Sequence, residues 1–179
     1  VLAWDFLELD VRGESMGGGA FVNYAVHRSR CASLTAEVGL DAKDTELFLL
    51  DELSSDDEIR LARVALAFDH IAWDGHTYGS LSAAQGLGDV LGALEEDDRR
   101  ASRRDADNSF TRVNLDVARV QGLTPWLAVF ARAYGQASTD SLVAGEQMQI
   151  GGADTVRGYP QAEYSGDDGY GASLELRAT

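Results

Sequence analysis

The chain has 179 residues, of which 45% are hydrophobic and 25% charged, and its formal net charge is −15. This length corresponds to one domain with enough apolar residues to bury a sizeable surface. The acidic excess argues against nucleic acid as a partner, because phosphate contacts need a basic face. No stretch approaches the roughly 20 apolar residues of a transmembrane helix, whereas a membrane β-barrel strand needs only about 9 to 11 residues with alternate ones apolar.

The single cysteine and the two ends of the chain narrow the possible classes of protein further. Cys31 has no partner for an internal disulfide, which excludes a disulfide scaffold and leaves it as a small hydrophobic residue, expected to be buried. The first residues, from Val1 to Asp5, lack the basic start and apolar core of a signal peptide. The last residues stop at Thr179 within an alternating pattern, so we expect a piece of a longer protein.

Alternation of apolar and polar residues runs through most of the chain and is typical of strands with one apolar and one polar face. It is clearest from Ala32 to Asp41, where every even position is apolar and every odd position is polar or glycine. In chain order the pattern predicts about eight strands, at residues 5–12, 18–26, 32–41, 63–70, 76–87, 110–118, 126–137 and 172–178.

The connections between these strands are predicted to alternate in length. In an antiparallel meander alternate turns share a rim, so one rim would carry tight turns and the other long loops, as in outer-membrane barrels. Short connections fall near residues 27–30, 73–75 and 121–125, and long ones near 41–58, 90–107 and 138–168. Net charges of −7, −2 and −5 belong to residues 41–58, 95–107 and 138–171, which places nearly all of the total charge on the long-loop rim.

Two architectures fit such strands. A soluble β-sandwich or small barrel would turn its apolar face inward and fill it with large side chains, whereas many apolar-face residues here are alanine. A transmembrane barrel would instead turn its polar face toward the lumen, where charges can pair across strands. The predicted lumen-facing charges include Arg63, Arg112, Asp116, Arg132, Glu175 and Arg177. Pattern alone leaves both architectures open.

The most specific segment runs from Met148 to Arg177. Its successive motifs are Gly151-Gly152, then Val156-Arg157-Gly158-Tyr159, then Ser165-Gly166-Asp167-Asp168-Gly169-Tyr170, and finally Ser173-Leu174-Glu175-Leu176-Arg177. This ordered set resembles the signature of the two-partner secretion transporters, the hemolysin-activator type of outer-membrane β-barrel within the outer-membrane assembly superfamily.

The resemblance implies an all-β fold, a transmembrane antiparallel β-barrel of about sixteen strands. Residues 1–179 would form the middle part of its C-terminal barrel domain, without the periplasmic domains and the last strands. The implied activity is export of an unfolded partner exoprotein from the periplasm through the outer membrane of a Gram-negative bacterium, with no nucleotide hydrolysis and no cofactor. The alternatives are an assembly factor of the same superfamily, which inserts other barrel proteins, and a soluble β-barrel or sandwich that binds a ligand.

The resemblance also assigns roles to the motif residues. In the family, the loop that holds the Val-Arg-Gly-Tyr motif folds back into the lumen, and its arginine pairs with an acid on the inner wall. Here that arginine is Arg157, and Gly158 beside it allows a sharp turn. The family's acid lies on a strand that would follow Thr179, so Asp116 or Glu175 would be substitutes within this chain.

Other candidate sites are weak. His70 and His76 flank the turn at Trp73, but no third ligand is fixed, so no metal site is expected. The sequence has no phosphate loop of the GxxxxGK type and no order of Ser, His and Asp that suggests a nucleophile with its base, so no catalytic residue is assigned and an enzyme is not expected. The three tryptophans are predicted at the membrane interface, in contact with outer-membrane lipid: Trp4, Trp73 and Trp126.

Overall fold

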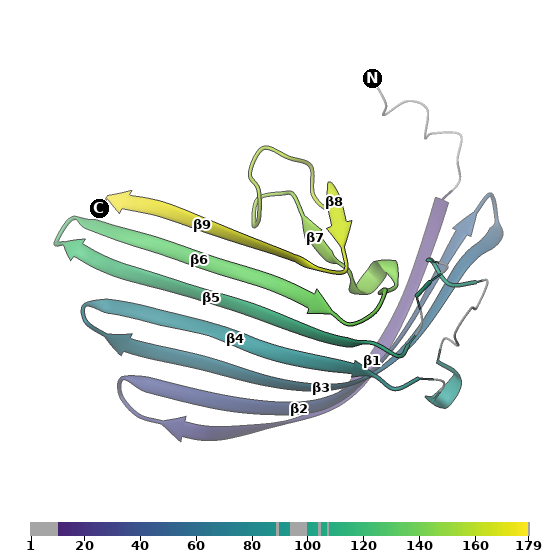
Figure 1. The fold of residues 1–179 in the computed structure, drawn as a ribbon, viewed down its shortest axis with the longest axis horizontal. Coiled ribbons are helices and arrows are strands. Elements are labelled where there is room, and N and C mark those ends of the chain that lie inside the picture. Colours follow the sequence, from purple (N-terminus) through teal and green to yellow (C-terminus); the bar gives the residue numbers. More distant parts are fainter. Residues whose placement is uncertain (1–10, 89, 94–99, 104, 107, 179) are drawn as a thin grey trace.

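The computed structural model of the chain describes residues 11–88, 90–93, 100–103, 105–106 and 108–178. Its main element is one curved antiparallel sheet of seven strands in the order β1-β2-β3-β4-β5-β6-β9 (Figure 1). These strands are β1 (Val11–Arg28), β2 (Ala32–Leu49), β3 (Glu52–Ala72), β4 (Gly75–Gly86), β5 (Thr111–Thr124), β6 (Leu127–Ser138) and β9 (Gly169–Ala178). The predicted all-β antiparallel meander is confirmed.

Two connections on one rim contain structure of their own. Between β4 and β5 lies the short 3₁₀ helix η1 (Val90–Gly92). Between β6 and β9 lie the 3₁₀ helix η2 (Ala144–Glu146) and a small hairpin of β7 (Met148–Ile150) and β8 (Tyr164–Gly166), which stands off the main sheet beside β9 (Figure 1). None of the helices in the described ranges is long and apolar enough to cross a membrane.

Among the described residues, the other rim carries only tight turns, as predicted. β1 and β2 are joined by residues 29–31, β3 and β4 by Trp73 and Asp74, and β5 and β6 by residues 125–126. Trp73 and Trp126 are strongly exposed in two of these turns, at 84% and 59%. Cys31 is exposed in the first turn, so the expectation that it is buried was wrong.

The prediction of a long loop at residues 41–58 was wrong. β2 and β3 run straight through this segment and meet at a two-residue turn, Leu50 and Asp51, both with positive φ. Acids face one another across the pair, with Asp44 opposite Glu58 and Glu46 opposite Asp56. The sequence pattern failed here because both faces of this extension are rich in polar residues, which removes the alternation that predicts a strand.

The first strands also differ from the prediction. A single strand, β1, runs without a break from Val11 to Arg28, across the region predicted as a connection between two strands. Glycines 17–19 do not interrupt it, because each keeps an antiparallel partner on β2. The separate strand predicted at residues 5–12 lies mostly outside the described residues, and its last two residues belong to β1.

The two faces of the sheet differ in what covers them. Register places most of the large apolar residues of β2 to β6 and β9 on one face, the outer face, where Leu174 and Leu176 are 74% and 73% exposed and Val64 is 52% exposed. A soluble sandwich would bury this face. The predicted wall charges share the opposite face, the polar face, which the β6–β9 connection approaches.

A compact apolar cluster lies at the long-connection rim. Ile59 and Leu61 of β3 are 2% exposed and pack with buried residues of both long connections. Alternation along β3 puts these two side chains on the same face as Arg63, which is the polar face. The remaining members are Ala106, Phe110, Leu142 and Val143. Packing at this cluster therefore draws the β4–β5 and β6–β9 connections over the polar face of the sheet.

Candidate functional site: the polar wall and the connection folded onto it

The polar face carries ion pairs between neighbouring strands. Arg63 of β3 donates from Nε to Asp41 of β2 at 3.0 Å and also pairs with Glu37. Such pairs between adjacent strands satisfy the donors of each guanidinium on a wall that has both signs of charge.

The same arrangement recurs at the other side of the sheet. Arg132 of β6 donates from Nε to Asp116 of β5 at 3.1 Å, and its guanidinium lies 5.0 Å from the centre of the Tyr134 ring. On β9, Arg177 pairs with Glu175 at 3.0 Å and stacks over the Phe130 ring at 4.2 Å. All the predicted wall charges thus share one face, and all except Arg112 pair with neighbours on it.

Glu146 of η2 is the most deeply buried ion-pair partner among the described residues, with a side chain that is 2% exposed. It accepts from Lys43 of β2 at 2.6 Å and pairs with Arg112 of β5. Its backbone carbonyl also accepts from Arg112 at 3.0 Å and from Gln136 of β6 at 3.2 Å. Glu146 therefore binds side chains from three strands of the polar face.

Sequence patterns did not indicate this role for Glu146. The residue lies in a predicted acidic loop and belongs to none of the recognised motifs. A signal exists only in retrospect: Arg112 and Lys43 are cations on the polar face, and buried cations need acids.

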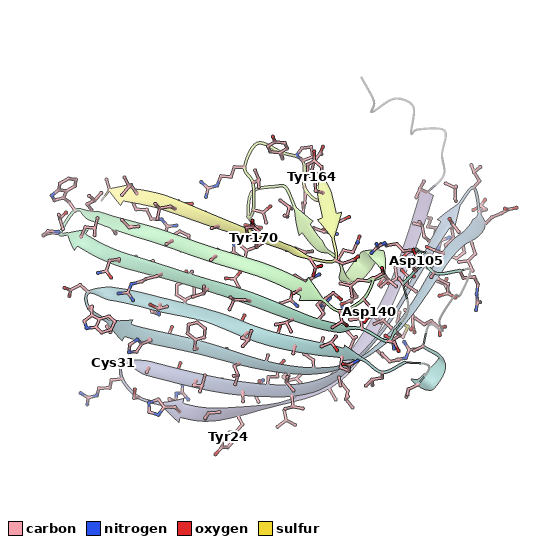
Figure 2. All side chains as sticks on the ribbon, viewed as in Figure 1. Tyr24, Cys31, Asp105, Asp140, Tyr164 and Tyr170 are labelled. Atoms are coloured by element: carbon pink, nitrogen blue, oxygen red, sulfur yellow. The ribbon has the colours of Figure 1, made fainter. Side chains whose placement is uncertain are left out.

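The predicted motif loop, residues 151–163, closes the small β7–β8 hairpin. Gly151, Gly152 and Gly158 all have positive φ, at 120°, 97° and 95°. A Cβ on Gly151 would collide with the Pro160 carbonyl, whereas Gly158 has open space around it, so only its backbone conformation requires glycine. Val156 and Tyr159 line a small hollow of the loop together with Ile150, Gly151, Glu163 and Tyr164, the last of which is labelled in Figure 2.

Arg157 reaches from this loop to the main sheet. Its Nη2 lies 2.9 Å from a carboxylate oxygen of Glu175 on β9, while its own side chain remains 76% exposed. Arg132 reaches the opposite way and donates to the carbonyl of Asp154 at 3.2 Å. The structure thus pairs Arg157 with one of the two substitute acids considered from sequence, and that acid also holds Arg177.

Asp167, the acid of the Ser-Gly-Asp motif, holds together the part of the same connection that lies next to the sheet. Its carboxylate accepts from Arg103 at 2.5 Å, from Gln147 at 2.9 Å and from the backbone N–H of Leu142 at 3.2 Å. Partial desolvation raises the pKa of Asp167, but the hydrogen bonds from Arg103, Gln147 and Leu142 outweigh it and hold the pKa below its usual value. Asp167 therefore joins both long connections as a carboxylate.

The remaining motif residues mainly shape the backbone. Ser165 and Gly166 pair with Gln149 and Met148 in the β7–β8 hairpin. Gly169 packs against the Met148 sulfur, where a Cβ would approach to 2.9 Å. Tyr170 (Figure 2), the second residue of β9, lies on the outer face and is 88% exposed.

The weak sites considered from sequence do not assemble. His70 and His76 lie on opposite faces of the β3–β4 hairpin, since His70 pairs with Thr77 and His76 with Ile71. His76 instead bonds to Asp69 at 2.5 Å. Within the described ranges, no group of three or more His, Cys, Asp or Glu residues could hold a metal ion.

Comparison with solved structures supports this architecture. CdiB from Escherichia coli matches with a TM-score of 0.80 and 22% identity, over 94% of this chain and 31% of that chain. CdiB from Acinetobacter baumannii matches with a TM-score of 0.70 and 18% identity, over 96% of this chain and 30% of that chain. The chain thus spans about a third of the length of these proteins. At this identity the likeness shows the fold.

Comparison of sequences gives the family. No curated protein sequence matches the chain significantly. The family profile of the haemolysin secretion/activation proteins ShlB/FhaC/HecB, by contrast, matches residues 2–179, which is nearly the whole chain. These proteins are transporters of the Gram-negative outer membrane rather than enzymes. The chain belongs to the ShlB/FhaC/HecB haemolysin secretion/activation family.

Proposed function

We propose that residues 1–179 form the middle part of the C-terminal β-barrel domain of an outer-membrane translocator that exports a partner exoprotein. The periplasmic domains and the last strands of the barrel would belong to other parts of the protein. Family membership and the meander that overlaps about a third of each CdiB structure support this proposal. The alternative of a barrel-assembly factor has no specific observation in its favour.

The observation that carries the proposal is the attachment of the β6–β9 connection to the polar face. An unfolded polypeptide exposes polar backbone groups, and a lumen with paired charges can solvate them where an apolar lumen could not. The attached connection would occupy the same space and would have to yield to the passing chain. Leu142 and Val143 of this connection pack in the apolar cluster at the rim, whereas its attachments along the wall are ion pairs and hydrogen bonds, which a polar substrate can replace.

We propose that Arg157 positions this connection for transport. Its exposed guanidinium is tied to Glu175 by one ion pair, and ion pairs open to water are weak. Such a contact can position the loop without locking it. Tyr159, two residues on, lines the small hollow of the same loop.

The test is export by the full-length protein with Arg157→Ala. Secreted partner is measured in the culture medium by immunoblot, and barrel insertion by heat-dependent mobility in electrophoresis. We expect export to fall at least tenfold while the inserted amount stays unchanged. Arg30→Ala, in an exposed tight turn of the opposite rim, is the matched control and should export normally. Normal export by Arg157→Ala would overturn the assigned role.

A further inference from the structure

The outer face of β5, β6 and β9 is hollowed along its middle strand. Ala131 and Ala133 of β6 present only methyl groups, while their register neighbours on β5 and β9 include the larger Val117 and Leu174. Together with Arg119 these residues line a hollow of about 480 Å³ with an almost wholly apolar lining. Its size and chemistry suit an extended hydrocarbon chain.

Arg119 lies at one end of this hollow, where a charged side chain is unusual because the surrounding face is apolar. Alternation along β5 puts it on the same face as Leu115 and Val117, which is the outer, apolar face. It donates to the Thr77 hydroxyl at 2.6 Å, to the Ala72 carbonyl at 3.2 Å and from Nε to the Gln121 amide oxygen at 3.0 Å. All three acceptors are neutral, so they orient the guanidinium without compensating its charge.

No carboxylate within the described ranges pairs with Arg119, although most of the polar-face arginines have one. Nη1 carries two hydrogens and gives one to Thr77 among these residues, which leaves the second for an anionic oxygen. The Thr77 hydroxyl accepts from Arg119 and keeps its own proton to donate. A planar guanidinium with a free N–H beside a hydroxyl is a good receptor for a phosphate.

The level of Arg119 on the sheet fits a lipid headgroup. It lies two residues from Gln121, whose amide donates to the Trp73 carbonyl in an exposed tight turn at 2.7 Å. Exposed tryptophan at a strand end is typical of the membrane–water interface. From this level the hollow covers residues 131–133 of β6 on the side of Arg119 away from the tight turns, where the first part of an acyl chain would lie below its phosphate.

We propose that Arg119 and the hollow over Ala131 and Ala133 bind one anionic phospholipid, with its phosphate on Arg119 and Thr77 and an acyl chain along β6. The apolar surface alone would accept any hydrocarbon. The uncompensated charge at its end selects a lipid with an anionic headgroup. The inference rests on the outer face being the lipid face and is independent of what the barrel exports.

Native mass spectrometry of the full-length protein in uncharged detergent tests this inference, with phosphatidylglycerol as the probe and phosphatidylcholine as the comparison lipid. We expect one phosphatidylglycerol to be retained preferentially, and retention to weaken about tenfold in Arg119→Gln. Ala131→Leu fills the hollow while leaving Arg119 in place and should weaken it to a similar extent. This second variant keeps the inference testable if Arg119→Gln does not insert.

Two matched controls separate this site from the general lipid surface. Arg12→Gln alters an outer-face arginine of β1 that is paired with Glu14, and Ala137→Leu enlarges an exposed alanine on the same strand and face beyond the hollow. Both should retain phosphatidylglycerol as the parent does. Equal retention by the parent and Arg119→Gln, equal loss in the controls, or displacement by inorganic phosphate alone would each overturn the inference. Loss of export with unchanged lipid retention would bear on the translocator proposal instead.

Discussion

The outer and polar faces of this sheet have the same backbone but opposite surroundings. The outer face exposes most of its large apolar side chains and is uncovered among the described elements, and Arg119 is a cationic position on it without a paired carboxylate among those elements. The polar face carries paired charges and receives a connection that is itself anchored by buried and half-buried acids. In a water-soluble protein the apolar face would be the covered one.

This arrangement, with the apolar face uncovered and the polar face covered, is the reverse of that in a water-soluble protein and is consistent with a different environment for each face. Apolar side chains need no protein partner where hydrocarbon surrounds them, whereas charged side chains on a narrow wall must find partners or water. The connection between β6 and β9 therefore attaches by ion pairs, and the apolar cluster at Phe110 and Leu142 forms only at the rim. The four predictions that follow test this contrast.

The largest effect is expected at Glu146. Glu146→Ala leaves Arg112 and Lys43 without their acid, and breaking a buried ion pair on one side costs about 3–5 kcal/mol. We expect residues 139–147 to detach from the wall and to become sensitive to added protease in the full-length protein. Lys43→Ala is the control, because Lys43 is 49% exposed and its loss should cost much less. Equal protease sensitivity in the two variants would contradict this account.

The contrast between faces predicts a second, somewhat smaller effect. Leu115→Arg puts a charge on the outer face at mid-sheet and should destabilise the inserted barrel by about 2–4 kcal/mol. Asn114→Arg, one residue earlier, puts the same side chain on the polar face and should be tolerated. Urea unfolding of the full-length protein in lipid vesicles measures both. A greater loss from Asn114→Arg would reverse the assignment of the faces.

Low pH should weaken the hydrogen bonds that Asp167 makes in the β6–β9 connection. The pKa of Asp167 is lowered in the folded protein, so its contribution is complete above the unfolded value of about 3.9 and is lost as pH falls through the folded value. Hydrogen bonds to a charged group contribute about 1.5–3 kcal/mol, and the lower figure applies here because Asp167 is 24% exposed.

The protection factor of the Leu142 N–H, which compares its hydrogen-exchange rate with the intrinsic rate at the same pH, should therefore fall below about pH 4 in the parent protein. In Asp167→Asn the protection factor should be low already at neutral pH and should change less with acid. Asp168→Asn, which removes a carboxylate bonded to the Ser138 N–H instead, is the control and should leave the profile at Leu142 intact. An unchanged pH profile in Asp167→Asn would show that another group governs this region.

The smallest perturbation is chemical labelling of the two faces. In a Cys31→Ser background, cysteine at position 112 or 132 should react with a water-soluble maleimide in the inserted full-length protein. Cysteine at position 113 or 129 should not, because the register places Val113 and Val129 on the outer face. Removal of Cys31 is necessary since its thiol is exposed. The reverse labelling pattern would invert the faces.

Much of this arrangement was predictable from sequence in the strands that have one apolar and one polar face. Alternation located β4, β5, β6 and β9 to within a few residues on most ends, and the tight turns at Trp73 and Trp126 marked one rim. The segment 41–58 was misread as a loop because the strands there carry polar residues on both faces, and period-two alternation vanishes without an apolar side. Pairing with the neighbouring strand, which a single sequence does not display, decides such a segment.

The sequence by itself determined the alternating wall, its charged face, and the motif from Gly151 to Tyr170 that carries the family resemblance. Only the tertiary structure decided what those charges bind: Glu146 to Arg112 and Lys43, Arg157 to Glu175, and Asp167 to Arg103. The reason is physical. Alternation is local and follows from the pleat of each strand, whereas partners more than 15 residues apart meet only after the sheet has formed and the connection has folded across it.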